Sequence, residues 1–237
     1  MDASPTVFIL DDDKSFLSAV GRLLQAEGFT TRSWSSASKF LADHDPEEPG
    51  CLLTDLLMPE MSGLELQSAL LASGCVRPIV FVTARGDMPT TVAGMRAGAI
   101  SFLPKPVRRS ELTAALREAI MKDAAIRAER AERLRIQDLR STLTPRERQV
   151  LELVAQGLRN KQIAGTLGAA VKTIKIHRGR VMRKMRVNSV AEVVQLLTHD
   201  RESAVEAATH PALVSSEVRV WPPTYQVSNT GSDSSRH

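Results

Sequence analysis

Short apolar runs alternate with amphipathic segments through the first half of the chain. Runs such as 7–10 and 79–82 are too short for helices and show no polar alternation, which is typical of strands buried on both faces. We predict strands near 6–10, 29–34, 51–55, 79–83 and 99–103, and helices near 15–27, 37–43, 63–73, 88–97 and from 109 onward. This alternation predicts an α/β domain over residues 1–122, with a five-stranded parallel sheet in a flavodoxin-like order.

The helical pattern that begins near residue 109 continues well beyond this domain. Its later part is rich in alanine and charge and contains no Gly or Pro, a composition that favours helix. We therefore predict a helical linker over residues 123–141. A dimer-forming coil is an alternative, although apolar residues at heptad spacing are few.

Residues 142–200 have the pattern of a small all-α domain. Thr144-Pro145-Arg146-Glu147 predicts a helix start with a capping box, and Asn160 is predicted to cap a second helix. A third helix should run from about 170 to 185, and Ser189-Val190-Ala191-Glu192 should open a fourth. The tight turn between the second and third helices indicates a helix-turn-helix unit.

Residues 201–237 are rich in Ser, Thr and Pro, and we predict a mostly disordered tail. Its small apolar island at 218–223 leaves a docking peptide as an alternative.

The third helix of the second domain has two unlike faces. At 100° per residue, Val171, Ile174 and Val181 fall on an apolar stripe, opposite a basic face. Such a helix can pack inward and lie in a DNA groove, whereas a solvated basic face is the simpler alternative. The candidate DNA-contacting residues are Lys161, Lys172, Thr173, Lys175, Ile176, His177, Arg178, Gly179, Arg180, Arg183 and Lys184.

The charge distribution supports a polyanionic partner for the second domain. The whole chain has a formal net charge of +4. Residues 142–200 hold 11 basic and 4 acidic side chains, whereas residues 1–122 have a net charge of −3. Positive charge concentrated in one small segment favours nucleic acid.

The remaining composition predicts a cytoplasmic protein. The two cysteines, Cys51 and Cys75, lie in or beside core segments, and we expect reduced, buried thiols. The sequence shows neither a signal-peptide pattern nor an apolar run of membrane-spanning length.

Chemistry-bearing side chains follow four of the predicted strands. They are Asp11-Asp12-Asp13, Asp55, Thr83 and Lys105. The carboxyl ends of neighbouring parallel strands meet at one edge of a sheet, so these groups should converge. Clustered carboxylates suit Mg²⁺, and a lysine beside a hydroxyl suits an added anion. The pattern predicts a phosphoryl group accepted by Asp55.

These residues resemble the receiver domain of bacterial response regulators over roughly residues 5–122. The matching positions are Asp11-Asp12, Asp55, Met58-Pro59, Gly63, Thr83 and Lys105. The resemblance implies that Asp55 is the phosphoacceptor and that Asp12 and Asp55 bind Mg²⁺ directly, with Asp11 acting through water. The other implied roles are a carbonyl ligand from Leu57, a switch pair of Thr83 and Phe102, and a usually cis Lys105-Pro106 bond.

Residues 142–200 resemble the LuxR-type DNA-binding domain. The matching segments are Leu143-Thr144-Pro145-Arg146-Glu147, Gly157, Asn160-Lys161-Gln162-Ile163-Ala164 and Thr173-Ile174-Lys175-Ile176-His177. Together the two resemblances place the chain among response regulators of the NarL/FixJ type. They imply a non-enzymatic regulator that receives phosphate from a sensor histidine kinase, dimerises, binds double-stranded DNA and activates transcription through RNA polymerase.

Two alternative functions remain open at this point. One is a DNA-binding regulator that does not depend on phosphorylation. The other is a phosphatase resembling the haloacid dehalogenases, in which Asp11 would be the nucleophile and Asp13 the acid. That second alternative fits Ser15 poorly and leaves residues 142–200 without a purpose.

Overall fold

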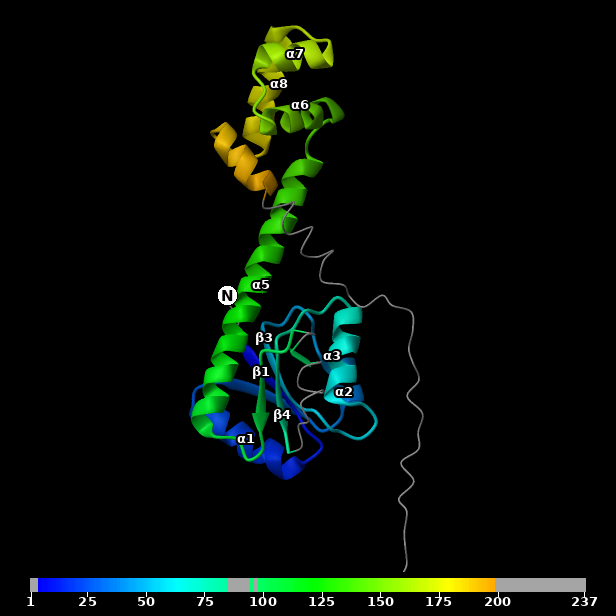
Figure 1. Ribbon diagram of the computed structural model, residues 1–237, viewed down its shortest axis with the longest axis vertical. Coiled ribbons are helices and arrows are strands. Elements are labelled where there is room, and N and C mark those ends of the chain that lie inside the picture. Colours follow the sequence, from blue (N-terminus) through cyan, green and yellow to red (C-terminus); the bar gives the residue numbers. More distant parts are fainter. Residues whose placement is uncertain (1–3, 85–93, 96–97, 199–237) are drawn as a thin grey trace, which may run out of the picture.

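The computed structural model describes residues 4–84, 94–95 and 98–198. Its amino-terminal domain contains a five-stranded sheet in the order β2-β1-β3-β4-β5, with every pair parallel (Figure 1). The flavodoxin-like prediction is therefore confirmed. The strands are β1 (Thr6–Leu10), β2 (Thr30–Trp34), β3 (Gly50–Asp55), β4 (Ile79–Thr83) and β5 (Ser101–Pro104).

Helices cover both faces of this sheet, as Figure 1 shows. One face packs on α1 (Lys14–Ala26) and on the first part of α5 (Arg109–Ser141). The opposite face packs on α2 (Ala37–Asp43) and α3 (Gly63–Ala72). Successive strand residues point to opposite sides, and both sides are covered, so the central strands consist of unbroken apolar runs. The helix predicted near 88–97 lies largely outside the described residues.

Helix α5 is a single continuous helix of 33 residues, about 50 Å long at the usual rise per residue. Residues 123–141 are helical, as predicted, but they do not form a separate element. Figure 1 shows α5 running from the sheet to the carboxyl-terminal domain. No break in the backbone marks the predicted boundary at residue 122.

The carboxyl-terminal domain is formed by α6 (Pro145–Ala155), α7 (Asn160–Leu167), α8 (Val171–Lys184) and a further helix over 190–198. Their apolar faces share one core, which includes Val150, Ile163, Ile174 and Val181. The predicted all-α domain is confirmed. The predicted tail at 201–237 lies outside the described residues.

The helix starts show which capping predictions were right. The Thr144 hydroxyl accepts a hydrogen bond from the Glu147 N–H, and the Glu147 carboxylate accepts one from the Thr144 N–H, so that capping box is confirmed. The prediction for Asn160 was wrong, because Arg159 is the N-cap of α7 and Asn160 is already helical. The Asn160 side chain instead accepts a hydrogen bond from Arg178 on α8 at 3.1 Å, so it joins two helices.

Two further predictions concern redox state and membranes. Cys51 and Cys75 are buried free thiols, as expected, and burial raises the pKa of Cys51 to about 12. Within the described part of the chain, no helix combines the length and apolar character that a bilayer crossing requires.

Candidate functional site

The sheet register brings the four strand ends to one edge. Leu10 pairs with Thr54, which places the residues after β1 beside the end of β3. Asp55 pairs with Val82, and Thr83 pairs with Pro104. Asp11, Asp55, Thr83 and Lys105 therefore follow one another across the sheet, as the sequence predicts.

Lys105 joins the two central carboxylates directly. Its ammonium lies 2.6 Å from an Asp11 carboxylate oxygen and 2.8 Å from an Asp55 carboxylate oxygen. The Phe16 ring lies on another side, with its centroid 4.2 Å from the Lys105 nitrogen. This arrangement holds a cation beside Asp55, where an added anionic group would meet it.

Burial and charge oppose one another at this site. Burial raises the pKa of Asp11, although the hydrogen bond from Lys105 works in the other direction. Burial also acts to lower the pKa of Lys105, but the hydrogen bonds to Asp11 and Asp55 and their charges together raise it. Lys105 is therefore held in its charged form by the pair of carboxylates.

The acidic residues are arranged as a divalent cation would require. One carboxylate oxygen from each of Asp11, Asp12 and Asp55 lies within 4.8 Å of the others. Oxygen ligands of this kind fit a hard cation such as Mg²⁺. Leu57 is adjacent, since its N–H donates to the second Asp55 carboxylate oxygen at 3.2 Å.

Asp13, the third acidic residue of the run, has a different task. Its side chain caps α1 by accepting hydrogen bonds from the N–H groups of Ser15 at 2.8 Å and Phe16 at 3.3 Å. The phosphatase alternative needs Asp13 as a free acid, so this geometry counts against it. The hydrogen bond from the Phe16 N–H to Asp13 was not predicted. The position of Asp13 directly before a predicted helix was the sequence signal for it.

The predicted switch pair occupies two neighbouring strands. Thr83 is buried at the end of β4, and the half-buried Phe102 stacks on Phe81 with ring centroids 4.7 Å apart. A Cβ at Gly94 would lie 2.4 Å from the Phe102 ring. Gly94 thus provides the space in which this ring sits, a role that sequence reasoning missed.

The basic face of α8 is open to solvent. Ile174, Val181 and Met185 are buried, as the helical wheel predicts, whereas Ile176 is 49% exposed. Val171 departs from the prediction, because it is 48% exposed at the start of the helix rather than buried. The other exposed candidates are Lys161, Lys172, Thr173, Lys175, Gly179, Arg180 and Arg183, and His177 and Arg178 are half-buried.

Lys184, one of the candidate DNA-contacting residues, has hydrogen-bond partners within its own domain. Its ammonium donates to the Glu147 carboxylate at 2.7 Å and to the Thr142 carbonyl at 2.8 Å. These partners lie at the junction of α5 and α6. The hydrogen bond from Lys184, helped by the Thr144 N–H, lowers the pKa of Glu147 to about 2. The Lys184 ammonium is therefore engaged within its own domain, and its contact with DNA stays a prediction.

Comparisons with known proteins match both domains. Residues 7–117 match the family model of the response regulator receiver domain, and residues 141–197 match that of the bacterial regulatory proteins of the luxR family. The transcriptional regulatory protein FixJ of Azorhizobium caulinodans is 36% identical over 196 residues, 83% of this chain and 93% of FixJ. The chain is a response regulator of the NarL/FixJ type.

Other relatives agree with this assignment. The response regulator protein TodT of Pseudomonas putida is 38% identical over 202 residues, 85% of the regulator described here and 89% of TodT. Among solved structures, the response regulator StyR is 46% identical with a TM-score of 0.76, covering 83% of this chain and 99% of StyR. Together with the two family-model matches, these relatives show that the chain is a two-component response regulator with a LuxR-type DNA-binding domain that regulates transcription.

Proposed function

We propose that a phosphoryl group on Asp55 switches this regulator between states of low and high affinity for DNA. The observation that carries the proposal is the position of Lys105, 2.8 Å from Asp55 and 2.6 Å from Asp11. An ammonium group at this position can pair with the Asp55 carboxylate before phosphorylation and with a phosphoryl oxygen after it. A sensor histidine kinase is the proposed donor.

In the transfer, a carboxylate oxygen of Asp55 forms a bond to phosphorus as the bond from phosphorus to the donor histidine nitrogen breaks. Lys105 then pairs with a phosphoryl oxygen while it keeps its contact with Asp11. Asp11, Asp12 and Asp55, with the Leu57 carbonyl, are the residues that would hold Mg²⁺. The ion, when bound, offsets negative charge on the phosphoryl oxygens.

The phosphoryl group adds about 1.5 to 2 negative charges and three acceptor oxygens. Thr83 lies on the strand beside Asp55 and would donate its hydroxyl to one of those oxygens. Phe102, on the next strand, would follow inward against Phe81. We propose that this movement changes the surface formed by residues 88–120, part of which lies outside the described residues, and that two copies then associate through it.

Association of two chains would bring two basic helices to DNA together. Effective concentration then raises affinity without new base contacts. We propose that the exposed Lys172, Lys175, Ile176 and Arg180 face base edges, with Thr173, His177, Gly179 and Arg183 around them. Lys161 and Arg178 would contact phosphates. Activation of transcription through RNA polymerase is the proposed outcome.

Phosphate incorporation tests the first step. The regulator is incubated with Mg²⁺ and radiolabelled acetyl phosphate, and acid-labile label on the protein is measured. We expect Asp55→Asn to abolish it. Asp13→Asn is the matched control, since asparagine also caps helices well, and it should keep the label. Label that survives in Asp55→Asn but vanishes in Asp11→Asn would favour the phosphatase chemistry instead.

A second experiment separates the phosphorylation-independent alternative. DNA ligands are selected from a random library with the phosphorylated regulator, and affinity for them is measured with and without acetyl phosphate. We expect tighter binding when Asp55 is phosphorylated. Equal affinities in both conditions would support a regulator that acts without phosphate.

A further inference from the structure

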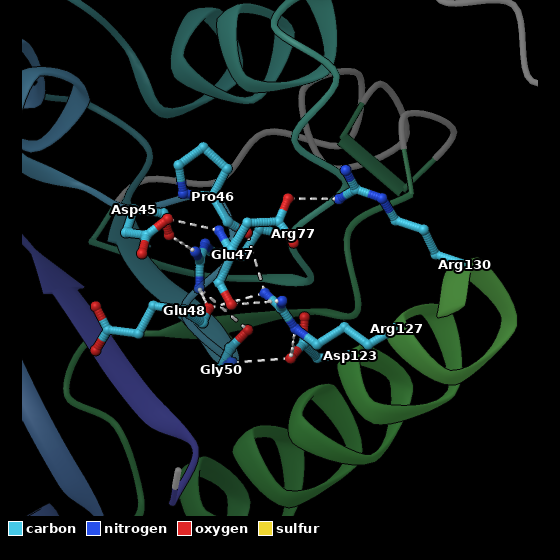
Figure 2. A network of polar contacts seen from close by, with 9 residues as sticks. All are labelled: Asp45, Pro46, Glu47, Glu48, Gly50, Arg77, Asp123, Arg127 and Arg130. Atoms are coloured by element: carbon cyan, nitrogen blue, oxygen red, sulfur yellow. Dashed lines mark hydrogen bonds and ion pairs between the residues drawn. The ribbon is translucent and has the colours of Figure 1, made fainter. Parts of the chain in front are cut away.

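A polar network joins α5 to the loop before β3, at the opposite end of that strand from Asp55 (Figure 2). Figure 2 shows the loop backbone lying between side chains of α5 and an arginine that precedes β4. The residues of this network, which we call the clamp, are Asp45, Pro46, Glu47, Glu48, Gly50, Arg77, Asp123, Arg127 and Arg130.

Arg127 is the centre of the clamp. Its guanidinium donates to the backbone carbonyl of Glu47 at 2.8 Å, and a second nitrogen donates to the carbonyls of Pro46 at 3.1 Å and Glu48 at 2.8 Å. Its third nitrogen donates to Asp123 at 2.8 Å. All three guanidinium nitrogens are thus used, and three of the four acceptors are carbonyls of one loop. A lysine, which has a single donor centre, cannot reproduce this planar fork.

Asp123 attaches the helix to the strand itself. Asp123 is only 3% exposed. One of its carboxylate oxygens accepts hydrogen bonds from both the Arg127 guanidinium and the Gly50 N–H, each at 2.8 Å. Position 50 requires glycine, because its φ is +144° and an added Cβ would overlap the Thr6 carbonyl oxygen. The first residue of β3 is therefore bound to α5 through a buried carboxylate.

The loop is also held from within the receiver domain. Arg77 donates to the carbonyls of Asp45 at 2.8 Å and Glu48 at 3.1 Å, and its guanidinium lies 4.1 Å from the centroid of the Phe8 ring. Arg77 is buried. Because this side of the loop is anchored in the core, the contacts of Arg127 tie α5 to a rigid part of the receiver domain.

The clamp shortens the unsupported part of α5. Arg130 pairs with Glu47 at 2.8 Å, and further along α5 Leu139 packs against the core of the DNA-binding domain. Residues 131–138 lie between these contacts, about 12 Å of helix, and Ile136 within this stretch is buried. With the clamp released, the last receiver contact among the described residues would be the packing of Ile120. The distance along α5 from that contact to Leu139 would then reach about 27 Å.

We propose that Asp123 and Arg127 are positioning residues that hold the DNA-binding domain at a fixed place relative to the receiver domain. The receiver body then extends to about residue 130 and includes the first part, residues 123–130, of the predicted linker. Both residues fall between the two segments matched by family models, 7–117 and 141–197, so the α5 side of the clamp lies outside both matched segments. The proposal does not depend on phosphorylation of Asp55.

Spin-label distances in the full chain test this proposal. Labels are placed on cysteines introduced at Lys39 and Gln195, which are exposed in the receiver and DNA-binding domains, while the native cysteines are buried. Labelled protein is diluted with unlabelled protein, so that only distances within one chain contribute. The variants are Arg127→Lys and Asp123→Asn. Arg135→Lys is the matched control, since Arg135 lies on the same helix and pairs with Glu132.

We expect a narrow distance distribution in the unchanged protein and in Arg135→Lys, and a distribution at least about twofold wider in Arg127→Lys and Asp123→Asn. Amide exchange at Gly50 should also accelerate by about tenfold or more in Asp123→Asn, as expected for the loss of a hydrogen bond to a charged acceptor. Protected sheet amides serve as the measure of a folded receiver.

Three results would overturn the proposal. The first is a distance distribution of unchanged width in both clamp variants. The second is a distribution that widens equally in Arg135→Lys. The third is loss of sheet protection in both clamp variants, because the two residues would then be needed to fold the receiver domain rather than to place its partner.

Discussion

Replacing Lys184 by methionine should weaken the DNA-binding domain in a way that depends on pH. The Glu147 carboxylate is 3% exposed and accepts hydrogen bonds from Lys184 at 2.7 Å and from the Thr144 N–H at 2.9 Å. Removing the ammonium leaves a buried carboxylate with only backbone and hydroxyl partners.

The size of the effect follows from the Glu147 pKa, which falls from 4.5 to about 2 in the folded protein. That shift corresponds to at most about 3 kcal/mol at neutral pH. Lys184 supplies only part of it, and its side chain is 32% exposed, so solvent screens the pair. We expect Lys184→Met to lower the free energy of unfolding of this domain by about 1–2 kcal/mol at pH 7.

The sign of the pH dependence is fixed by the direction of the shift. A carboxyl group with a lowered pKa stabilises the folded state fully above its unfolded pKa of 4.5 and loses that contribution as the pH falls toward 2. The gap between Lys184→Met and the unchanged protein should therefore be largest above pH 5 and should close toward pH 2. Hydrogen exchange of the α6 and α8 amides measures the stability of this domain separately from that of the receiver domain.

Arg183→Met is the control for this experiment. It removes the neighbouring, exposed cation on the same turn of α8, and it should change stability by less than about 0.5 kcal/mol. A gap for Lys184→Met that stayed constant between pH 7 and pH 3 would refute the reasoning, because the loss would then come from packing rather than from the carboxylate.

Three other perturbations have defined outcomes. Lys105→Met should slow phosphate incorporation from acetyl phosphate by at least about tenfold, because the lysine ammonium would no longer meet a phosphoryl oxygen; an unchanged rate would remove Lys105 from the chemistry. Gly63→Ala should destabilise the receiver domain by about 1–3 kcal/mol in urea unfolding followed at Trp34, since the added Cβ would lie 2.6 Å from the Asp55 carbonyl oxygen; unchanged stability would mean that this turn relaxes freely. Lys175→Ala should weaken binding to library-selected DNA by about 1–3 kcal/mol, and an equal loss on random DNA would place Lys175 on phosphate instead of a base.

The parts of the site that the sequence predicted share one property. Asp11 and Lys105 directly follow β1 and β5, and Asp55 and Thr83 are the last residues of β3 and β4. Parallel strands bring such positions to a common edge whatever the loops do. The apolar stripe of α8 was predictable for a similar reason, because helical periodicity alone assigns Ile174 and Val181 to the core. Val171, the first residue of α8, departs from that rule and is 48% exposed.

Contacts between distant segments were not predictable from local patterns. The spacing of Asp123 and Arg127 suggests an ordinary surface pair along a helix, and nothing near them in sequence points to the loop at 44–50 that they hold. Lys184 likewise looks like one more cation on a basic helix, although its partner Glu147 lies 37 residues away. In both cases the deciding partner is a backbone carbonyl or a buried carboxylate that only the fold brings close.

Chemical mapping of the phosphorylated residue tests the central claim most directly. The regulator is treated with acetyl phosphate and Mg²⁺, the acyl phosphate is reduced with borohydride, and peptides are sequenced by mass spectrometry. Asp55 should be converted to homoserine, while Asp11, Asp12 and Asp13 stay intact. Homoserine at any of those three positions, or at none of the four, would contradict a phosphoryl switch built on Asp55 and Lys105.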